Sequence, residues 1–161
     1  MPRIRALCAA CPMHAASWLC PPLSPDIERR IDALPDVSIL ALKITPHNPP
    51  PKPPASPRSG DLGTLAMAEG RAILEPMLLR LEQELDGHAC GLSGRCPYCP
   101  GLPCARTLGE PCRHPDLARP SLEALGYDVT AIAADILGCP ILWARDGTPP
   151  PYYTLVTALF H

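Results

Sequence analysis

Nine cysteines are distributed over this 161-residue chain, and most of them fall into two groups whose spacing suits metal binding. The larger group is the stretch CPYCPGLPCARTLGEPC, which contains the four thiols of Cys96, Cys99, Cys104 and Cys112. Proline, glycine and polar residues between them favour turns over regular helix or strand. Thiolates converge on a metal only where the backbone wraps around it, and a turn-rich sequence permits that path. We therefore predict that these four cysteines bind one metal centre.

The second group lies near the N-terminus, in CAACPMHAASWLCPP. Cys8 and Cys11 are spaced to bind one metal from a single turn, and Cys20 precedes two prolines that limit the direction of the chain. Three thiolates are one short of a closed tetrahedral site or of a four-iron cluster. The missing position belongs to another side chain of this chain, to a ligand from a partner or to an exchangeable small molecule, as in catalytic metal sites. The candidates for an additional ligand within the chain are His14, Cys90 and Cys139.

The spacing of the larger group, C-x2-C-x4-C-x7-C, favours an iron–sulfur cluster over zinc. Structural zinc usually takes two CxxC pairs that lie far apart. A staggered run of cysteines suits the larger four-iron, four-sulfur (4Fe-4S) cluster, whose ligands arrive from several directions. Arg113 and His114 directly follow Cys112, and we expect them to donate hydrogen bonds to the cluster or to offset its charge. Zinc is the alternative metal, and an exposed turn is the alternative place for His114.

Composition and charge argue against several other classes of protein. A formal net charge of −2 and an aromatic content of 4% give no basis for binding nucleic acid. No apolar run is long enough to span a membrane, and Pro12 and His14 interrupt the N-terminal apolar stretch that would form an export signal. We therefore expect a cytoplasmic protein, in which closely spaced cysteines indicate metal binding more often than disulfides or thiol redox chemistry. No nucleotide fingerprint or Ser-His-Asp set is recognisable, so the sequence assigns no catalytic residue.

Apolar periodicity predicts that residues 1–161 form one α+β domain. Its core would be a small antiparallel sheet of about three strands packed by helices, with two turn-rich cysteine lobes that bind metal. The strands are expected at 37–44, 141–145 and 152–160, with a turn over 146–151 between the last two. The strand at 37–44 is apolar nearly throughout, which predicts that both of its faces are covered.

Helix signals occur in four further stretches. Ser24 and Pro25 begin a helix that Pro35 ends, and Asp128 caps another over 129–137. A leucine stripe predicts a helix over 65–86, kinked or divided at Pro76, and a short helix is expected from Ser121 to Gly126. Residues 46–57 carry seven prolines in twelve positions and should form an exposed insertion, either a spacer or a docking ligand for a proline-recognition domain.

At its cysteine motifs the chain resembles the prokaryotic "predicted metal-binding protein" family, a domain of unknown function (number 2284). CAACPMHAASWLCPPLSP is similar to a family pattern of C-x2-C followed by a tyrosine, a tryptophan and CPP, although His14 stands where the family usually has tyrosine. The stretch from CPYCP to GYDV is similar to a pattern of C-x2-C, a further cysteine, CRHP, ARPS, EA and G-x-DV. With the terminal YYTLVTALF, the resemblance covers most of the chain. It implies metal binding, with iron–sulfur favoured, and it implies no particular reaction.

These observations favour an iron–sulfur protein that passes single electrons to or from a protein partner, or supplies a cluster to one. Two alternatives stay open. The first is a zinc module whose metal stabilises a small fold and presents a surface for a partner. The second is a metalloenzyme with an open cluster site at the N-terminal cysteines.

Overall fold

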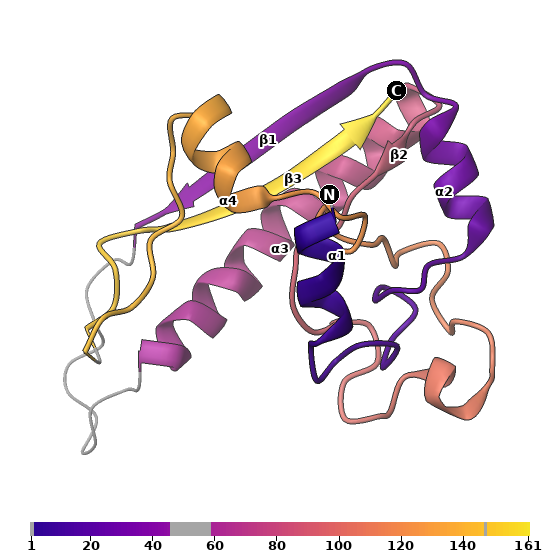
Figure 1. The fold of residues 1–161 in the computed structure, drawn as a ribbon, viewed down its shortest axis with the longest axis horizontal. Coiled ribbons are helices and arrows are strands. Elements are labelled where there is room, and N and C mark those ends of the chain that lie inside the picture. The colour runs from indigo at the N-terminus through magenta and orange to yellow at the C-terminus, as the bar shows by residue number, and fades with distance from the viewer. Residues whose placement is uncertain (1, 46–58, 147) are drawn as a thin grey trace.

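A three-stranded antiparallel sheet in the order β1-β3-β2 organises the fold (Figure 1). The computed structural model describes residues 2–45, 59–146 and 148–161. The strands are β1 (Val37–Ile44), β2 (His88–Ala89) and β3 (Tyr153–Phe160). The structure thus confirms the α+β class, whereas the predicted proline-rich insertion at 46–57 lies outside the described residues.

The long pair of strands agrees with the sequence pattern. β1 and β3 pair along their whole length, from Val37 opposite Phe160 to Ile44 opposite Tyr153. The expectation that both faces of β1 are covered is wrong, because β1 is an edge strand and only Ile44 is buried in it. The central strand β3 is buried from its second residue onward, and it is the strand whose two faces are both covered.

The predicted strand at 141–145 is wrong. Residues 141–144 have no regular structure, and Arg145 makes only an isolated bridge with Thr148. The third strand is instead the two-residue β2, which pairs with the end of β3. Three consecutive prolines at 149–151 explain the difference, because they cannot donate hydrogen bonds to a hairpin ladder next to β3.

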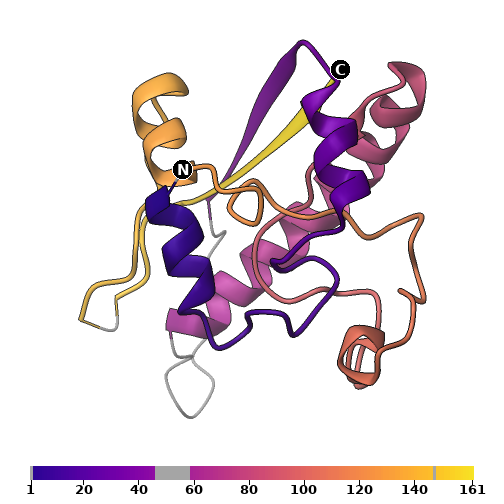
Figure 2. The ribbon, with the colours of Figure 1, turned by 45° about the vertical axis from the view of Figure 1, so that its right-hand side comes forward.

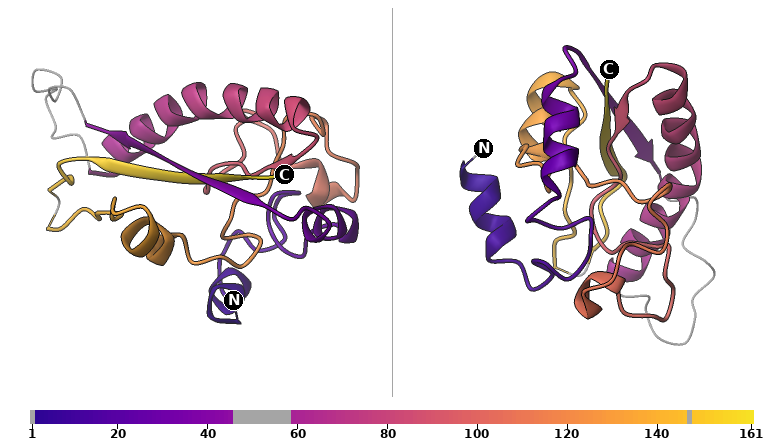
Figure 3. Two further views of the ribbon diagram at one scale, coloured as in Figure 1. Left: turned by 90° about the horizontal axis from the view of Figure 1, so that it is seen from above. Right: turned by 90° about the vertical axis from the view of Figure 1, so that its right-hand side faces the viewer.

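Helices cover the sheet on both faces (Figure 3). The helix α3 (Ser59–Glu84) packs on one face through a cluster that includes Leu74 and Leu78. α2 (Pro25–Asp32) and α4 (Val129–Ala131, continued by the π-helical turn η2, Ile132–Ile136) lie on the other face. Alternate residues of β3 face the two layers, as its alternating pattern predicts.

The helix caps follow the sequence signals, and two predicted helices differ from expectation in other ways. The Ser24 hydroxyl accepts a hydrogen bond at the start of α2, and the Asp128 carboxylate does so at the start of α4. α3 runs through Pro76 as one helix, so the predicted division at this proline is wrong, and buried leucines on both sides of the proline pack against the sheet. The stretch from Ser121 to Gly126 forms turns and not the predicted helix.

One helix has no counterpart among the predicted elements. α1 (Pro2–Ala9) carries Cys8 and has no buried residue. It lies beside the start of α4, where Arg3 forms an ion pair with Asp128 at 3.7 Å (Figure 2). No helix in the described part of the chain is long and apolar enough to cross a membrane.

Candidate metal centre

The larger cysteine group lies on a long loop that leaves the sheet after β2 and returns to it. We call residues 92–120 the cysteine lobe; its regular structure is the 3-10 helix η1 (Ala105–Leu108) (Figure 1). A backbone bridge between Gly91 and Ser121 closes the neck of the lobe. A Cβ atom on Gly91 would lie 2.5 Å from the Arg119 carbonyl oxygen, so glycine permits this close approach.

Five thiols line one cavity of about 680 Å³, which we call the cysteine cavity. Four of them are the predicted set of the cysteine lobe, and Cys20 of the N-terminal group is the fifth. The five are Cys20, Cys96, Cys99, Cys104 and Cys112. All nine cysteines of the chain are free thiols. The structure therefore brings the four predicted ligands to one wall and adds a thiol from a distant part of the chain.

The thiols surround the cavity without meeting at a point. Within the described ranges, no three Cys, His, Asp or Glu side chains are placed so that they could hold a single metal ion. The cavity wall carries no carboxylate among the described residues, and such a thiol-rich donor set suits soft metals, including iron–sulfur clusters and zinc. The residues present thus fit a thiolate-bound metal centre in their chemistry.

The pKa of Cys96 depends on its burial and on the neighbouring thiols. Burial raises the pKa of Cys96, a hydrogen bond from the Tyr98 backbone opposes that rise, and the charges of Cys112, Cys99 and Cys104 raise the pKa further. Since a metal binds the deprotonated thiolate, a bound cation would remove this mutual repulsion.

The helix α3 positions the first part of the lobe. The Arg71 guanidinium donates to the carbonyl oxygens of Leu92 (2.9 Å) and Ser93 (2.8 Å) and forms an ion pair with Glu75. The Tyr98 hydroxyl donates to the other Glu75 oxygen at 2.6 Å. Burial and the Glu75 carboxylate together raise the pKa of Tyr98 and keep it a donor. This network fixes the backbone on both sides of Cys96 against a long helix.

Arg106 connects the two cysteine groups. From the first turn of η1 it donates to three carbonyl oxygens of the N-terminal loop: Ser17 (2.8 Å), Cys20 (2.6 Å) and Pro22 (2.9 Å). The Trp18 indole adds a hydrogen bond to the Glu110 carbonyl oxygen at 3.1 Å. These contacts explain how Cys20 reaches the cysteine cavity.

Arg113 and His114 also line the cysteine cavity. Arg113 donates to the Pro103 carbonyl oxygen at 2.9 Å and lies 3.5 Å from the Glu110 carboxylate. The His114 ring is tilted against the Tyr98 ring, with centroids 6.4 Å apart. Both side chains therefore stand where they could act on a bound metal centre, and that action stays a prediction.

The other two N-terminal thiols face a different space. Cys8 and Cys11 line a second cavity of about 700 Å³. Burial raises the pKa of Cys8, and the charges of Cys11, Glu123 and Cys20 raise it further. The predicted trio is thus close in space but divided between two cavities.

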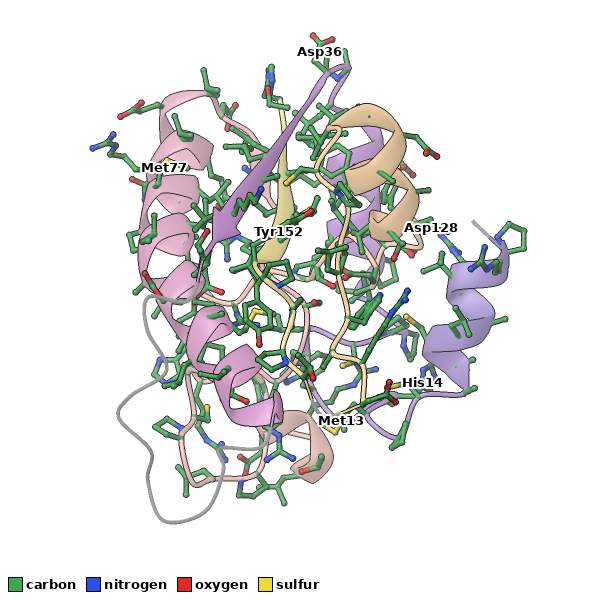
Figure 4. The ribbon with its side chains drawn as sticks, turned by 90° about the vertical axis from the view of Figure 1, so that its left-hand side faces the viewer. Met13, His14, Asp36, Met77, Asp128 and Tyr152 are labelled. Carbon is green, nitrogen blue, oxygen red and sulfur yellow. The ribbon has the colours of Figure 1, made fainter. Side chains whose placement is uncertain are left out.

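The three candidate additional ligands have different surroundings. The His14 ring lies 3.1 Å from the Cys8 carbonyl oxygen, on the loop that follows α1 (Figure 4). Cys90 is fully buried in the core, and Cys139 lies 3.6 Å from the Thr154 hydroxyl. Neither the cysteine cavity nor the second cavity includes any of these three residues in its wall.

Comparison with known protein families identifies the family of this chain. The family model described as "Predicted metal-binding protein (DUF2284)" matches residues 1–158. The chain belongs to this family. The family's description supports metal binding in general and specifies neither the metal nor a reaction. No curated protein and no solved structure matched the chain.

In this member of the predicted metal-binding family, the cysteine spacing alone did not reveal the residues that hold the lobe. Arg71, Glu75 and Arg106 act over long sequence separations, and nothing in a single sequence pairs them. The sequence carries no signal for the partners of Arg106, because they lie on the N-terminal loop and not on the loop that carries Arg106.

Proposed function

We propose that this protein is an iron–sulfur protein whose cysteine cavity holds a 4Fe-4S cluster. The observation that carries the proposal is the set of five thiols around one cavity of about 680 Å³. A 4Fe-4S cluster takes four cysteine ligands, so the wall supplies a full set.

The proposed role is the transfer of single electrons to or from a protein partner, or the supply of the cluster to one. The cluster would carry the redox chemistry, and the chain would set its environment. Arg113 and His114 on the wall would adjust the potential through hydrogen bonds and charge. Leu102 lines the same cavity and is 63% exposed, which offers an apolar contact for a partner beside the cluster. Nine free thiols suit the reducing cytoplasm.

Anaerobic purification followed by analysis of iron, acid-labile sulfide and zinc tests the proposal. We expect a brown protein with iron and sulfide in equal amounts and a spectrum that bleaches reversibly on reduction. Single changes to serine at Cys96, Cys99, Cys104 and Cys112 should each lower the iron content by about one cluster. The matched control is Cys139→Ser, which lies outside the cysteine cavity.

Two outcomes would contradict the proposal. Stoichiometric zinc without visible absorbance would indicate the structural zinc module instead. Full iron content in all four serine variants would show that these thiols are not the ligands. Electron transfer and cluster supply are separated by mixing the loaded protein with a cluster-free acceptor ferredoxin and following where the iron goes.

A further inference from the structure

Cys8 and Cys11 are the two cysteines of the N-terminal group that the proposed cluster does not use. Cys20, the third member of that group, lines the cysteine cavity, whereas Cys8 and Cys11 line the second cavity. Two thiols are fewer than the protein ligands of a zinc site or of a 4Fe-4S cluster. Within the described ranges, no further Cys, His, Asp or Glu side chain is placed to complete a single-ion site with them. The pair therefore calls for a chemistry that two thiols can carry out by themselves.

A tight turn holds the two cysteines at a separation that a disulfide can span. The Cys11 amide donates to the Cys8 carbonyl oxygen at 3.2 Å, which closes a turn over the four residues CAAC. The Cα atoms at the two ends of such a turn lie within about 7 Å of each other. Cysteines in a disulfide have their Cα atoms about 4.4–6.8 Å apart. The backbone of the free thiols is thus already suited to a bond between Cys8 and Cys11.

The two thiols differ in exposure and in hydrogen bonding. Cys11 is exposed, and its sulfur accepts a hydrogen bond from the Met13 amide at 3.4 Å. Such a donor stabilises the negative charge that a sulfur carries when it attacks a disulfide or leaves one. Cys8 is half-buried, and its thiol donates to the Glu123 carbonyl oxygen at 3.5 Å. An external molecule can therefore reach Cys11, and Cys8 can react with Cys11 from the protein side.

The position of α1 permits the side-chain movement that bond formation requires. Cys8 belongs to this helix, which has no buried residue and lies at the outside of the molecule (Figure 3). A segment with few buried contacts rearranges at a low cost in free energy. Closing a disulfide at the end of α1 should therefore leave the sheet and its two covering layers unchanged.

We propose that Cys8 and Cys11 form a thiol–disulfide exchange site whose substrate is a disulfide, R–S–S–R. The Cys11 sulfur attacks one sulfur of the substrate, releases one R–S–H and forms a mixed disulfide. The Cys8 sulfur then attacks the Cys11 sulfur, releases the second R–S–H and forms the Cys8–Cys11 disulfide. The released thiols take up the two protons that the protein thiols lose, and two electrons pass from the pair to the substrate. A dithiol reductant regenerates the pair by the reverse exchange.

Incubation of the full chain with glutathione disulfide under anaerobic conditions tests the site. The protein is then denatured, its free thiols are alkylated, and its peptides are analysed by mass spectrometry. We expect a disulfide between Cys8 and Cys11 that dithiothreitol reverses, with Cys20 recovered in the alkylated form. Residues 6–29 form one tryptic peptide that contains all three cysteines, so fragmentation of this peptide assigns the bond.

Two serine variants test the separate roles of the two thiols. Cys8→Ser should lose the disulfide and accumulate a glutathione adduct on Cys11, because the second attack is no longer possible. Cys11→Ser should lose the disulfide without accumulating an adduct on Cys8, because the exposed attacking thiol is missing. The matched control is Cys139→Ser, which removes a half-buried cysteine outside both cavities. This control should form the Cys8–Cys11 disulfide to the same extent as the unchanged protein.

Three outcomes with glutathione disulfide would overturn the proposal. They are the absence of a Cys8–Cys11 bond, a bond between Cys8 and Cys20 in its place, and equal accumulation of the adduct in the two serine variants. Iron and zinc measured on the same samples separate this result from the proposed function. Cys11→Ser should keep its full metal content, and loss of metal from it would identify Cys11 as a metal ligand and overturn the exchange site. A failure of the iron–sulfur proposal would leave the disulfide result standing.

Discussion

Burial distinguishes Cys90 from the cysteines that line the two cavities. Its side chain has 0% exposure, and burial raises its pKa to about 12. Because the thiolate is the reactive form, Cys90 should resist alkylation in the folded protein. We expect iodoacetamide at pH 8 to modify the exposed Cys11 of metal-free protein well before Cys90, measured by peptide mass spectrometry. Modification of both at similar rates without denaturant would contradict the buried position.

A second prediction at the level of single residues concerns pH. Burial lowers the pKa of His88, whose Nε2 atom is buried without a partner. The unfolded chain therefore binds a proton more readily than the folded chain as the pH falls below the ordinary value of 6.5. The free energy of unfolding should decrease between that pH and the lower pKa of the folded state.

Urea denaturation of metal-free protein, followed by circular dichroism from pH 8 to pH 5, measures this effect. In the variant His88→Gln, the free energy of unfolding should depend less steeply on pH, because the contribution of His88 is removed. The control His14→Gln, which changes an exposed ring, should keep the steeper dependence. Glu82 adds to the loss at lower pH. Burial opposes its ionisation, but hydrogen bonds from Arg119 and the Ala89 amide lower its pKa overall, so its contribution disappears only on further acidification.

At the scale of elements, the sequence predicted structure where the local pattern and the tertiary contacts agree. β1 and β3 have the expected apolar patterns, and both pair as long strands. Residues 141–145 have a similar local pattern, yet β2 takes the place next to β3 instead. Whether residues 141–145 or β2 pair with β3 depends on the prolines after residue 145 and on the path of the cysteine lobe. Neither can be read from the five residues of the strand pattern itself.

Arg106 joins two separate segments of the structure, so the effect of replacing it is easy to interpret. Its three hydrogen bonds join η1 to the loop that carries Cys20. Arg106→Ala should increase hydrogen exchange in residues 17–22, with little change in β3. Arg106→Lys should restore only part of the protection, because a compact ammonium cannot replace the planar guanidinium in reaching three carbonyl oxygens. Arg80→Ala, on the exposed face of α3, is the control. Equal exchange in the unchanged and Ala proteins would show that the two cysteine groups do not depend on this contact.

At the scale of the whole molecule, the grouping of the four lobe cysteines was predictable from the sequence, but the assembly of the candidate site was not. The spacing from Cys96 to Cys112 predicted thiols that lie together, and they line one cavity. The spacing from Cys8 to Cys20 predicted one group, whereas the fold divides it between two cavities. That division arises because Arg106 holds Cys20 while α1 holds Cys8 beside Glu123, and these contacts span 86 and 115 residues of the sequence. No spacing rule within a single motif contains such contacts.

The cysteine lobe has few buried residues and little regular secondary structure to stabilise its fold. Between residues 92 and 120 only Leu92, Ala105 and Pro120 are buried, and η1 is the regular element. Structural thiolate–metal sites contribute on the order of 10 kcal/mol of binding free energy to the folded state. That amount is comparable to the whole net stability of a domain, roughly 5–15 kcal/mol. Removing the proposed metal centre should therefore disorder the lobe and leave the sheet and α3 folded.

Hydrogen exchange measured by mass spectrometry, before and after chelation under reducing conditions, tests this expectation. Protection should fall across residues 92–120 and persist in β3 and in the part of α3 around Leu78, which is 1% exposed. Cys104→Ser should reproduce the chelated pattern without a chelator, whereas Cys139→Ser should match the loaded protein. If the lobe keeps its protection after the metal is removed, the network of Arg71, Glu75 and Tyr98 is sufficient to hold it. The metal centre would then have a chemical role without a structural one.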